Sequence, residues 1–270
     1  MAKRIIVALL YLPIFIIVLF FLPPWCSVVF ASLLSAIAAW EVLHNTGLVK
    51  APFPLTLSIL SALTLPAAIC FGIRFPLILF YYLAVLAALF VYGMYHTESF
   101  TFASIGAILF GSVVIPCFFS VFPIILSADY GKYLIVLPFL TAWSCDTFAY
   151  FTGMAMGKHK LIPHISAKKT IEGSIGGILG CALSLAGYGL VLQFAFDLTP
   201  NYLGLVILGL VGSVISQIGD LSMSLIKREN HIKDYGKIMP GHGGILDRFD
   251  SVLFVLPVVY AVLAVFPLIG

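Results

Sequence analysis

The sequence predicts an all-α polytopic integral membrane protein, with about nine transmembrane helices, a cytoplasmic N-terminus and the C-terminus outside. The composition is 62% hydrophobic and only 9% charged, whereas soluble domains carry about 25% charged residues. Apolar segments of roughly the 20 residues that span a bilayer recur along the chain, and they do not alternate as barrel strands do. The predicted segments are 5–22, 25–43, 54–72, 76–95, 102–125, 133–156, 174–195, 202–225 and 248–268.

The distribution of Lys and Arg predicts the orientation, because cytoplasmic loops carry an excess of both. With the N-terminus inside, only Arg74 and Lys132 fall in outside loops, and Arg248 lies at the cytoplasmic mouth of the last segment. The predicted cytoplasmic cations are Lys3, Arg4, Lys50, Lys158, Lys160, Lys168, Lys169, Lys227, Arg228, Lys233 and Lys237.

The two halves of the chain differ in their polar residues. The apolar run of residues 5–22 is longer than the roughly 7–15 residues of a signal peptide core, so we expect it to be the first span. Residues 1–130 are otherwise plain apolar spans, with Glu41 as the main ionisable residue, and we expect a scaffold or a lipid- or partner-facing part. Residues 131–270 hold both basic loops, and we expect the catalytic transmembrane part there.

The sixth predicted segment carries Asp146, and the loop after it offers Lys168, Lys169 and Glu172. Basic loops beside a membrane commonly only set topology, and this alternative stays open for the earlier lysines of the loop. Four glycines then follow at spacings that suit close helix packing. They are Gly173, Gly176, Gly177 and Gly180.

The eighth predicted segment has a polar face, because five polar residues recur at spacings of 4, 3, 4 and 3. They are Ser213, Gln217, Asp220, Ser224 and Lys227. An Asp within a span costs roughly 2.5–3.5 kcal/mol on insertion scales, so it normally faces a protein interior or a water-filled cavity. The alternative is a polar seam between helices, in which Asp220 forms an ion pair with a neighbour.

The start of the ninth segment places Asp247 and Asp250 on one helical face, with Arg248 between them. Two carboxylates at this spacing repel unless a cation neutralises them, and oxygen ligands suit Mg²⁺. Helix capping could explain one Asp, but not all three residues. Glycines in the preceding loop, 233–244, let backbone N–H groups approach an anion, which favours a site for phosphate and metal.

Two stretches in the second half resemble the phosphatidate cytidylyltransferases, also called CDP-diacylglycerol synthases. The family signature is similar to residues 224–251, SLIKRENHIKDYGKIMPGHGGILDRFDS. A second family block, close to DTGAYFFGRKFGKHK and SPKKTWEG, resembles residues 145–177, CDTFAYFTGMAMGKHKLIPHISAKKTIEGSIGG. Matching positions are Asp146, Lys168, Lys169, Thr170, Glu172 and Gly173, and departures are Phe148, Ala167 and Ile171.

The resemblance implies transfer of CMP from CTP to phosphatidic acid, dependence on Mg²⁺ and a homodimer in the cell (inner) membrane, with the site facing the cytoplasm. A second cation is left open, and we expect membrane lipid but no nucleic acid as a partner. We expect Asp220, Lys227, Asp247 and Asp250 to be catalytic, and Asp146, Glu172, Asp220, Asp247 and Asp250 to hold metal. We expect substrate to contact Lys168, Lys169, Ser224, Arg228, Lys233, His242, Gly243, Gly244 and Arg248.

Two other functions remain open at this point. A related enzyme could use CTP to phosphorylate a polyprenol or another membrane alcohol. A transporter could use Asp146, Asp220 and Glu41 as an ion path, although it would tend to show broken helices at corresponding places in its two halves.

Overall fold

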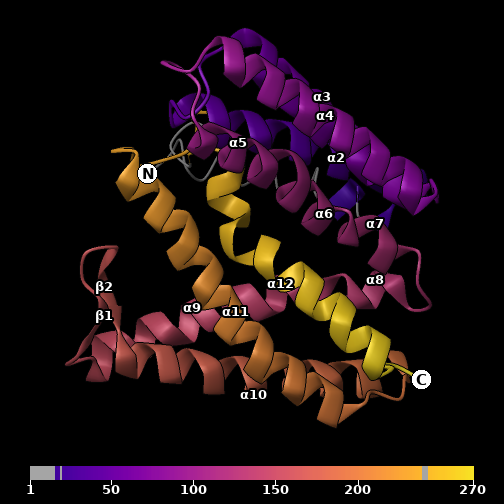
Figure 1. Cartoon of the computed structure of the whole chain (residues 1–270). Helices are drawn as coiled ribbons and strands as arrows, with labels where there is room; N and C mark the ends of the chain where they lie inside the picture. The colour runs from indigo at the N-terminus through magenta and orange to yellow at the C-terminus, as the bar shows by residue number, and fades with distance from the viewer. Residues whose placement is uncertain (1–15, 19, 239–242) are drawn as a thin grey trace. The chain divides into compact units, whose positions relative to one another are not determined.

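The computed structural model describes residues 16–18, 20–238 and 243–270, and Figure 1 shows the chain as helices with one short hairpin. Among these residues, eight helical segments are long and apolar enough to cross a membrane. They are Pro24–Asn45, Pro52–Cys70, Phe75–Tyr95, Phe102–Leu126, Gly131–Met156, Ile171–Phe196, Tyr202–Glu229 and Leu246–Val265. The all-α membrane class is therefore confirmed. The first predicted segment, 5–22, lies mostly outside the described residues, so the count of nine and the orientation stay predictions.

The chain divides into two compact units. The first unit comprises Met1–Ser127 and Asn230–Arg248, and the second comprises Ala128–Glu229 and Phe249–Gly270. The boundary therefore falls within the first turn of the last helix. The sequence motif at 224–251 is shared between the two units, and the Gly-rich loop belongs to the first. The assignment of scaffold and catalytic roles to the two halves stays a prediction.

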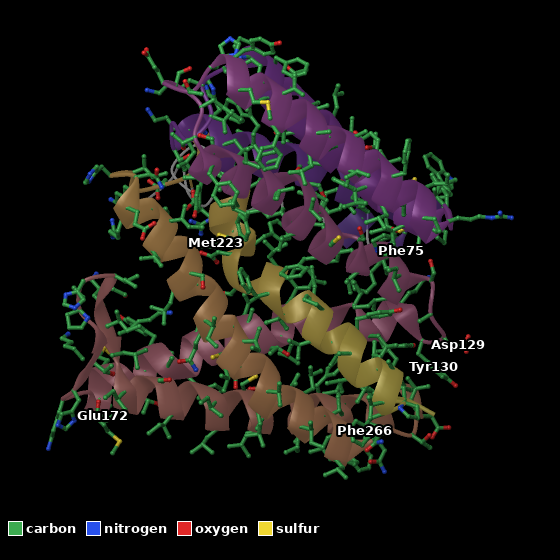
Figure 2. All side chains as sticks on the ribbon, viewed as in Figure 1. Phe75, Asp129, Tyr130, Glu172, Met223 and Phe266 are labelled. Carbon is green, nitrogen blue, oxygen red and sulfur yellow. The ribbon has the colours of Figure 1, made fainter. Side chains whose placement is uncertain are left out.

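The first unit consists of apolar helices, and its three longest each have a proline in the first turn, where its missing N–H costs nothing. Its first long helix packs against five later elements, whereas α4 is largely exposed, as Phe75 illustrates in Figure 2. The elements are α2 (Pro24–Trp40), the π-helical turn η1 (Glu41–Asn45), α3 (Pro52–Cys70), α4 (Phe75–Tyr95), α5 (Phe102–Leu109), η2 (Phe110–Val114), α6 (Ile115–Phe119) and α7 (Val121–Leu126).

The second unit contains a helix bundle and an antiparallel hairpin in which Lys160 pairs with Thr170 and Ile162 with Ser166. The hairpin was not predicted, because strands of three and five residues without apolar alternation give no strand signal. The elements are α8 (Gly131–Leu134), α9 (Val136–Met156), β1 (Lys160–Ile162), β2 (Ser166–Thr170), α10 (Ile171–Phe196), α11 (Tyr202–Glu229) and α12 (Leu246–Val265), which belongs to this unit from Phe249 onward.

The glycines of α10 make its contact with α9 possible, as the spacing predicted. A Cβ built on any of the four would come too close to atoms of α9. The α9 groups that these glycines meet are the carbonyls of Ala149 and Cys145 and the side chains of Thr152 and Phe148. This close packing fixes the start of α10 beside the middle of α9, where Asp146 lies.

Candidate functional site

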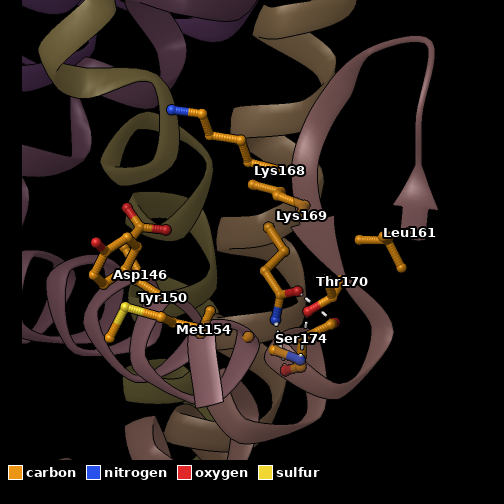
Figure 3. Close-up of a pocket in the computed structure, with 12 residues that line it drawn as sticks. Asp146, Tyr150, Met154, Leu161, Lys168, Lys169, Thr170 and Ser174 are labelled. Carbon is orange, nitrogen blue, oxygen red and sulfur yellow. Dashed lines mark hydrogen bonds between the residues drawn. The ribbon is translucent and has the colours of Figure 1, made fainter. Parts of the chain in front are cut away.

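A cavity of about 270 Å³ in the second unit brings together polar residues of the sixth predicted segment and of the loop after it. Figure 3 shows Asp146 of α9, Lys168 and Lys169 of β2 and Ser174 of α10 around it. Apolar side chains complete the wall, among them Met154 and Leu161. The cavity therefore combines cations and a carboxylate with an apolar surface, as a site for an amphiphilic anion requires.

The end of the hairpin positions the two lysines of the cavity. Strand β2 ends at Thr170, and α10 begins at the next residue. The Thr170 hydroxyl accepts a hydrogen bond from the Gly173 amide at 3.1 Å, so Thr170 is the N-cap of α10. The cap fixes the direction in which the strand enters the helix, and with it the positions of Lys168 and Lys169.

Lys169 forms an ion pair with Asp220 of α11. Each side chain is 26% exposed, so the pair is partly removed from solvent. The ion pair joins the hairpin to the polar face of α11, and it confirms the alternative in which Asp220 is paired with a neighbour. The same pair places Asp220 beside the cavity that Lys169 lines.

Three carboxylates from three helices of the second unit are close enough to interact electrostatically: Asp146 of α9, Asp220 of α11 and Asp250 of α12. The positive charge of Lys227 attracts the Asp250 carboxylate, and that of Lys169 attracts the Asp146 carboxylate. Helix α12 approaches α11 closely beside Asp220, because Phe254 packs against Gly219, where no Cβ would fit. We call Asp146, Lys169, Asp220, Lys227 and Asp250 the charged cluster.

The charged cluster is compatible with a hard cation. Within the described part of the chain, no group of three or more His, Cys, Asp or Glu side chains is arranged to hold a metal ion. Mg²⁺ does not require such a group, because it is commonly held by one or two carboxylates together with waters and substrate phosphates. Asp220 and Asp250 can supply these carboxylates, and their mutual repulsion favours a cation between them.

The part of the polar face of α11 that lies N-terminal to Asp220 contacts α10. Gln217 accepts a hydrogen bond from the Ser174 hydroxyl at 2.5 Å through Oε1, and its Nε2 donates to the Ser174 carbonyl at 3.3 Å. Both residues line the cavity. Gln217 therefore joins two helices, as the seam alternative predicted, whereas the functional roles of Asp220 and Lys227 stay predictions.

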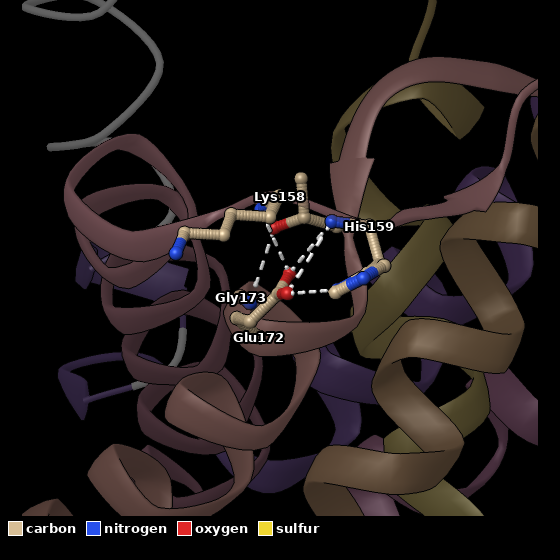
Figure 4. A network of polar contacts seen from close by, with 5 residues as sticks. Lys158, His159, Glu172 and Gly173 are labelled. Carbon is tan, nitrogen blue, oxygen red and sulfur yellow. Dashed lines mark hydrogen bonds and ion pairs between the residues drawn. The ribbon is translucent and has the colours of Figure 1, made fainter.

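Glu172 has local partners (Figure 4). Its carboxylate accepts hydrogen bonds from the backbone amides of Lys158 and His159 at 3.2 Å, and His159 Nδ1 lies 2.6 Å from Oε1. These bonds tie the start of the hairpin to the first turn of α10. The predicted role of Glu172 as a metal ligand stays a prediction, and the structure adds a second role in closing the base of the hairpin.

Asp247 is buried in the first unit and organises the loop before α12. Its Oδ2 accepts hydrogen bonds from the amides of Tyr235 at 2.7 Å and Gly244 at 2.9 Å. Gly243, with a φ of +86°, adopts a conformation that favours glycine, and its backbone lies against the Asp247 carboxylate. The predicted catalytic and metal roles of Asp247 stay predictions beside this observed one.

The remaining predicted residues differ in exposure. Lys233 and Arg248 are exposed and Ser224 is half-buried, whereas His242 lies outside the described residues. The Arg228 Nε donates to the Ile165 carbonyl in the hairpin at 3.5 Å. No signal in the sequence indicated a site role for Ser174, although this residue lies within the block 145–177, next to the matching position Gly173.

Most of the chain is similar to one family of known proteins. Residues 2–266 match the profile of the cytidylyltransferase family. A phosphatidate cytidylyltransferase of Bacillus subtilis (strain 168) is 44% identical over 179 residues, which cover 66% of this chain and 65% of that protein. Proteins of the same name from Staphylococcus epidermidis and Staphylococcus haemolyticus are 51% and 49% identical over 127 residues, which cover 47% of each chain. The chain thus spans between about half and two thirds of the length of these relatives.

Proposed function

Because the chain belongs to the cytidylyltransferase family, we propose that it transfers CMP from CTP to phosphatidic acid, giving CDP-diacylglycerol and pyrophosphate. The names of the similar bacterial proteins support this substrate pair. The observation that carries the proposal is the cavity of about 270 Å³, which two lysines of the hairpin and a carboxylate of α9 line together with apolar side chains. Such a site suits a reaction between a water-soluble nucleotide and a lipid.

In the proposed reaction, a phosphate oxygen of phosphatidic acid attacks the α-phosphorus of CTP. A new P–O bond forms, the bond from the α-phosphorus to the oxygen bridging to the β-phosphorus breaks, and pyrophosphate leaves with that electron pair. The nucleophile is already an anion, so no strong base is required. The main barrier is the approach of two anions and the charge that develops on the leaving group, which fixed cations reduce.

The residues of the second unit divide this work. Lys168 and Lys169 bind phosphate oxygens in the cavity, and Lys227 and Arg228 bind further phosphate oxygens from the end of α11. Asp220 and Asp250 would hold Mg²⁺, with Asp146 nearby, and the ion would supply positive charge against the phosphates. Glu172 and Asp247 remain candidates for the ion, and a second cation is left open. The substrate contacts proposed from the sequence also include Ser224, Lys233, His242, Gly243, Gly244 and Arg248.

The proposed site faces the cytoplasm, where CTP is available, in a multi-pass protein of the cell membrane. Phosphatidic acid would enter sideways from the lipid, and its headgroup would remain at the interface. The apolar wall of the cavity, which includes Met154 and Leu161, supports this route. We also propose a homodimer, as the family resemblance implies.

The test is transfer of label from α-³²P CTP into lipid by purified protein in detergent, with phosphatidic acid and Mg²⁺. We expect transfer by the wild type and a loss of roughly 10²-fold or more in Asp250→Asn and Asp220→Asn, because each removes a charge that acts in the transition state. The matched control is Asp129→Asn, which makes the same change at an exposed position of the second unit and should leave transfer unchanged.

The same assay distinguishes the alternatives. A CTP-dependent lipid kinase would move label from γ-³²P CTP into lipid and none from α-³²P CTP. An absence of any lipid label from protein shown to be folded would contradict both enzymes and would return attention to a transporter.

A further inference from the structure

Glu41 is a fully buried carboxylate at the end of α2, and its partners lie far away in the sequence. Its Oε1 accepts a hydrogen bond from the Ile245 amide at 2.9 Å, and its Oε2 accepts one from the Leu246 amide at 2.8 Å. These are amides at the N-terminus of α12, which have no acceptor within their own helix. The helix dipole also favours a negative charge at this place.

The loop backbone is shaped to fit this carboxylate. A Cβ on Gly236 or Gly244 would collide with the Glu41 side chain, so only glycine permits the loop to approach on both sides. A second tie comes from the same π-helical turn, because Asn45 Nδ2 donates to the Tyr235 carbonyl at 2.6 Å. All of these contacts lie within the first unit.

The π-helical turn η1 explains how one helix supplies both ties. Such turns insert an extra residue into a helix and are frequent at functional sites. Here the turn begins at Glu41 and ends at Asn45. A buried carboxylate is costly unless hydrogen bonds satisfy it, and the turn holds Glu41 where two backbone amides supply these bonds.

We propose that Glu41 is a positioning residue for the reaction: it holds Gly236, Gly244 and the first turn of α12, and thereby fixes Asp247 and the helix start that precedes Asp250. This inference rests on the proposed function. The positioning acts through helix α12 alone. Asp247 and Asp250 both lie near the start of this helix, next to the amides that donate to Glu41. It also gives Glu41 a use other than an ion path.

The test variant is Glu41→Gln, which keeps the shape of the side chain but replaces one acceptor oxygen with an NH₂ group. One of the two α12 amides then has no acceptor. We expect kcat for CMP transfer to fall roughly ten- to a hundredfold, as for a small misplacement of catalytic groups. We expect the KM for CTP to rise by a smaller factor than kcat falls, because Glu41 reaches the proposed substrate contacts Gly243 and Gly244 only through the backbone of the loop.

The matched control is Glu98→Gln, the same substitution at an exposed position of the first unit, for which kcat should equal that of the wild type. Amide hydrogen exchange of residues 243–248 gives a second readout that needs no activity. Exchange in this segment should be at least about tenfold faster in Glu41→Gln and unchanged in Glu98→Gln. Wild-type kcat and wild-type exchange in Glu41→Gln would overturn the inference.

Two further outcomes are also decisive. If the wild type shows no CMP transfer, the proposed function fails, and the exchange measurement still tests whether Glu41 holds the loop. If Glu41→Gln does not fold, Asn45→Ala replaces it, because it removes the second tie from a half-buried position. A faster exchange of residues 243–248 with a lower kcat would support the inference, and no change in either would overturn it.

Discussion

The charges of Lys169 and Asp220 stabilise each other, because both side chains are partly buried. Removing one partner leaves a charge without its counterion, whereas removing both leaves a less polar contact. We expect Lys169→Met and Asp220→Asn each to lower the free energy of unfolding by roughly 1–3 kcal/mol. The double variant should be less destabilised than the sum of the two by at least about 0.5 kcal/mol.

Unfolding in detergent, followed by heat or denaturant, measures this double-mutant cycle. Lys160→Met is the matched control, since it makes the same change at an exposed position of the same hairpin, and it should alter stability by less than about 0.5 kcal/mol. All variants that lack Lys169 or Asp220 should lose CMP transfer, including the double variant. Strictly additive stability costs would contradict the pairing.

The sequence predicted the residue types of the site but not their pairing. A carboxylate within an apolar span is conspicuous, so Asp146 and Asp220 could be predicted as functional. The partner of Asp220 could not be predicted, because Lys169 lies in a short hairpin that has no sequence signal. Glu41 was conspicuous for the same reason as Asp220, but its partners are backbone amides, which no side-chain pattern reveals.

At the scale of elements, the contact between α9 and α10 depends on glycine. Gly177 lies against the Cys145 carbonyl, where a larger side chain would force the two helices apart. We expect Gly177→Leu to lower the free energy of unfolding by about 1–3 kcal/mol and to reduce CMP transfer, because Asp146 is on the displaced part of α9. Thermal unfolding in detergent and the transfer assay measure both effects.

Gly187 provides the control for this prediction, because it lies in the same helix and a Cβ there would meet nothing within 4 Å. Gly187→Leu should be neutral or slightly stabilising, since leucine has a higher helix propensity than glycine. Equal destabilisation by both substitutions would show that the helix backbone, and not the contact with α9, responds to the change.

The helical segments could be predicted closely because length and continuous hydrophobicity determine them. The predicted range 76–95, for example, corresponds to Phe75–Tyr95, and 202–225 is extended by a polar turn to Glu229. The hairpin could not be predicted, because its register depends on the Glu172 bonds at its base and on the start of α10, neither of which is a property of the strands themselves.

At the scale of the whole molecule, orientation can be tested directly. With a cytoplasmic N-terminus, position 129 lies outside and position 164 lies inside. We expect a cysteine at Asp129 to react with a membrane-impermeant maleimide in intact cells, and a cysteine at His164 to react only after permeabilisation. The background must lack the native cysteines, which are free: Cys26, Cys70, Cys117, Cys145 and Cys181. Labelling at His164 and not at Asp129 would reverse the topology.

The composition of the two units was the part of the architecture that the sequence did not reveal. The chain was expected to change character near residue 130, and the first of the two segments that make up the first unit ends at Ser127. The return of Asn230–Arg248 to that unit depends on the Glu41 and Asn45 contacts, which join residues about two hundred positions apart. Contacts of this kind follow from tertiary structure and have no local signal.

The ion pair between Lys169 and Asp220 has a consequence for biosynthesis. Chains are made from the N-terminus, so Lys169 is synthesised before α11 leaves the ribosome. The residue that pairs with Asp220 is therefore available when α11 enters the bilayer, and pairing reduces the cost of inserting a charged helix. A chain without Lys169 should consequently yield less inserted protein, in addition to losing CMP transfer.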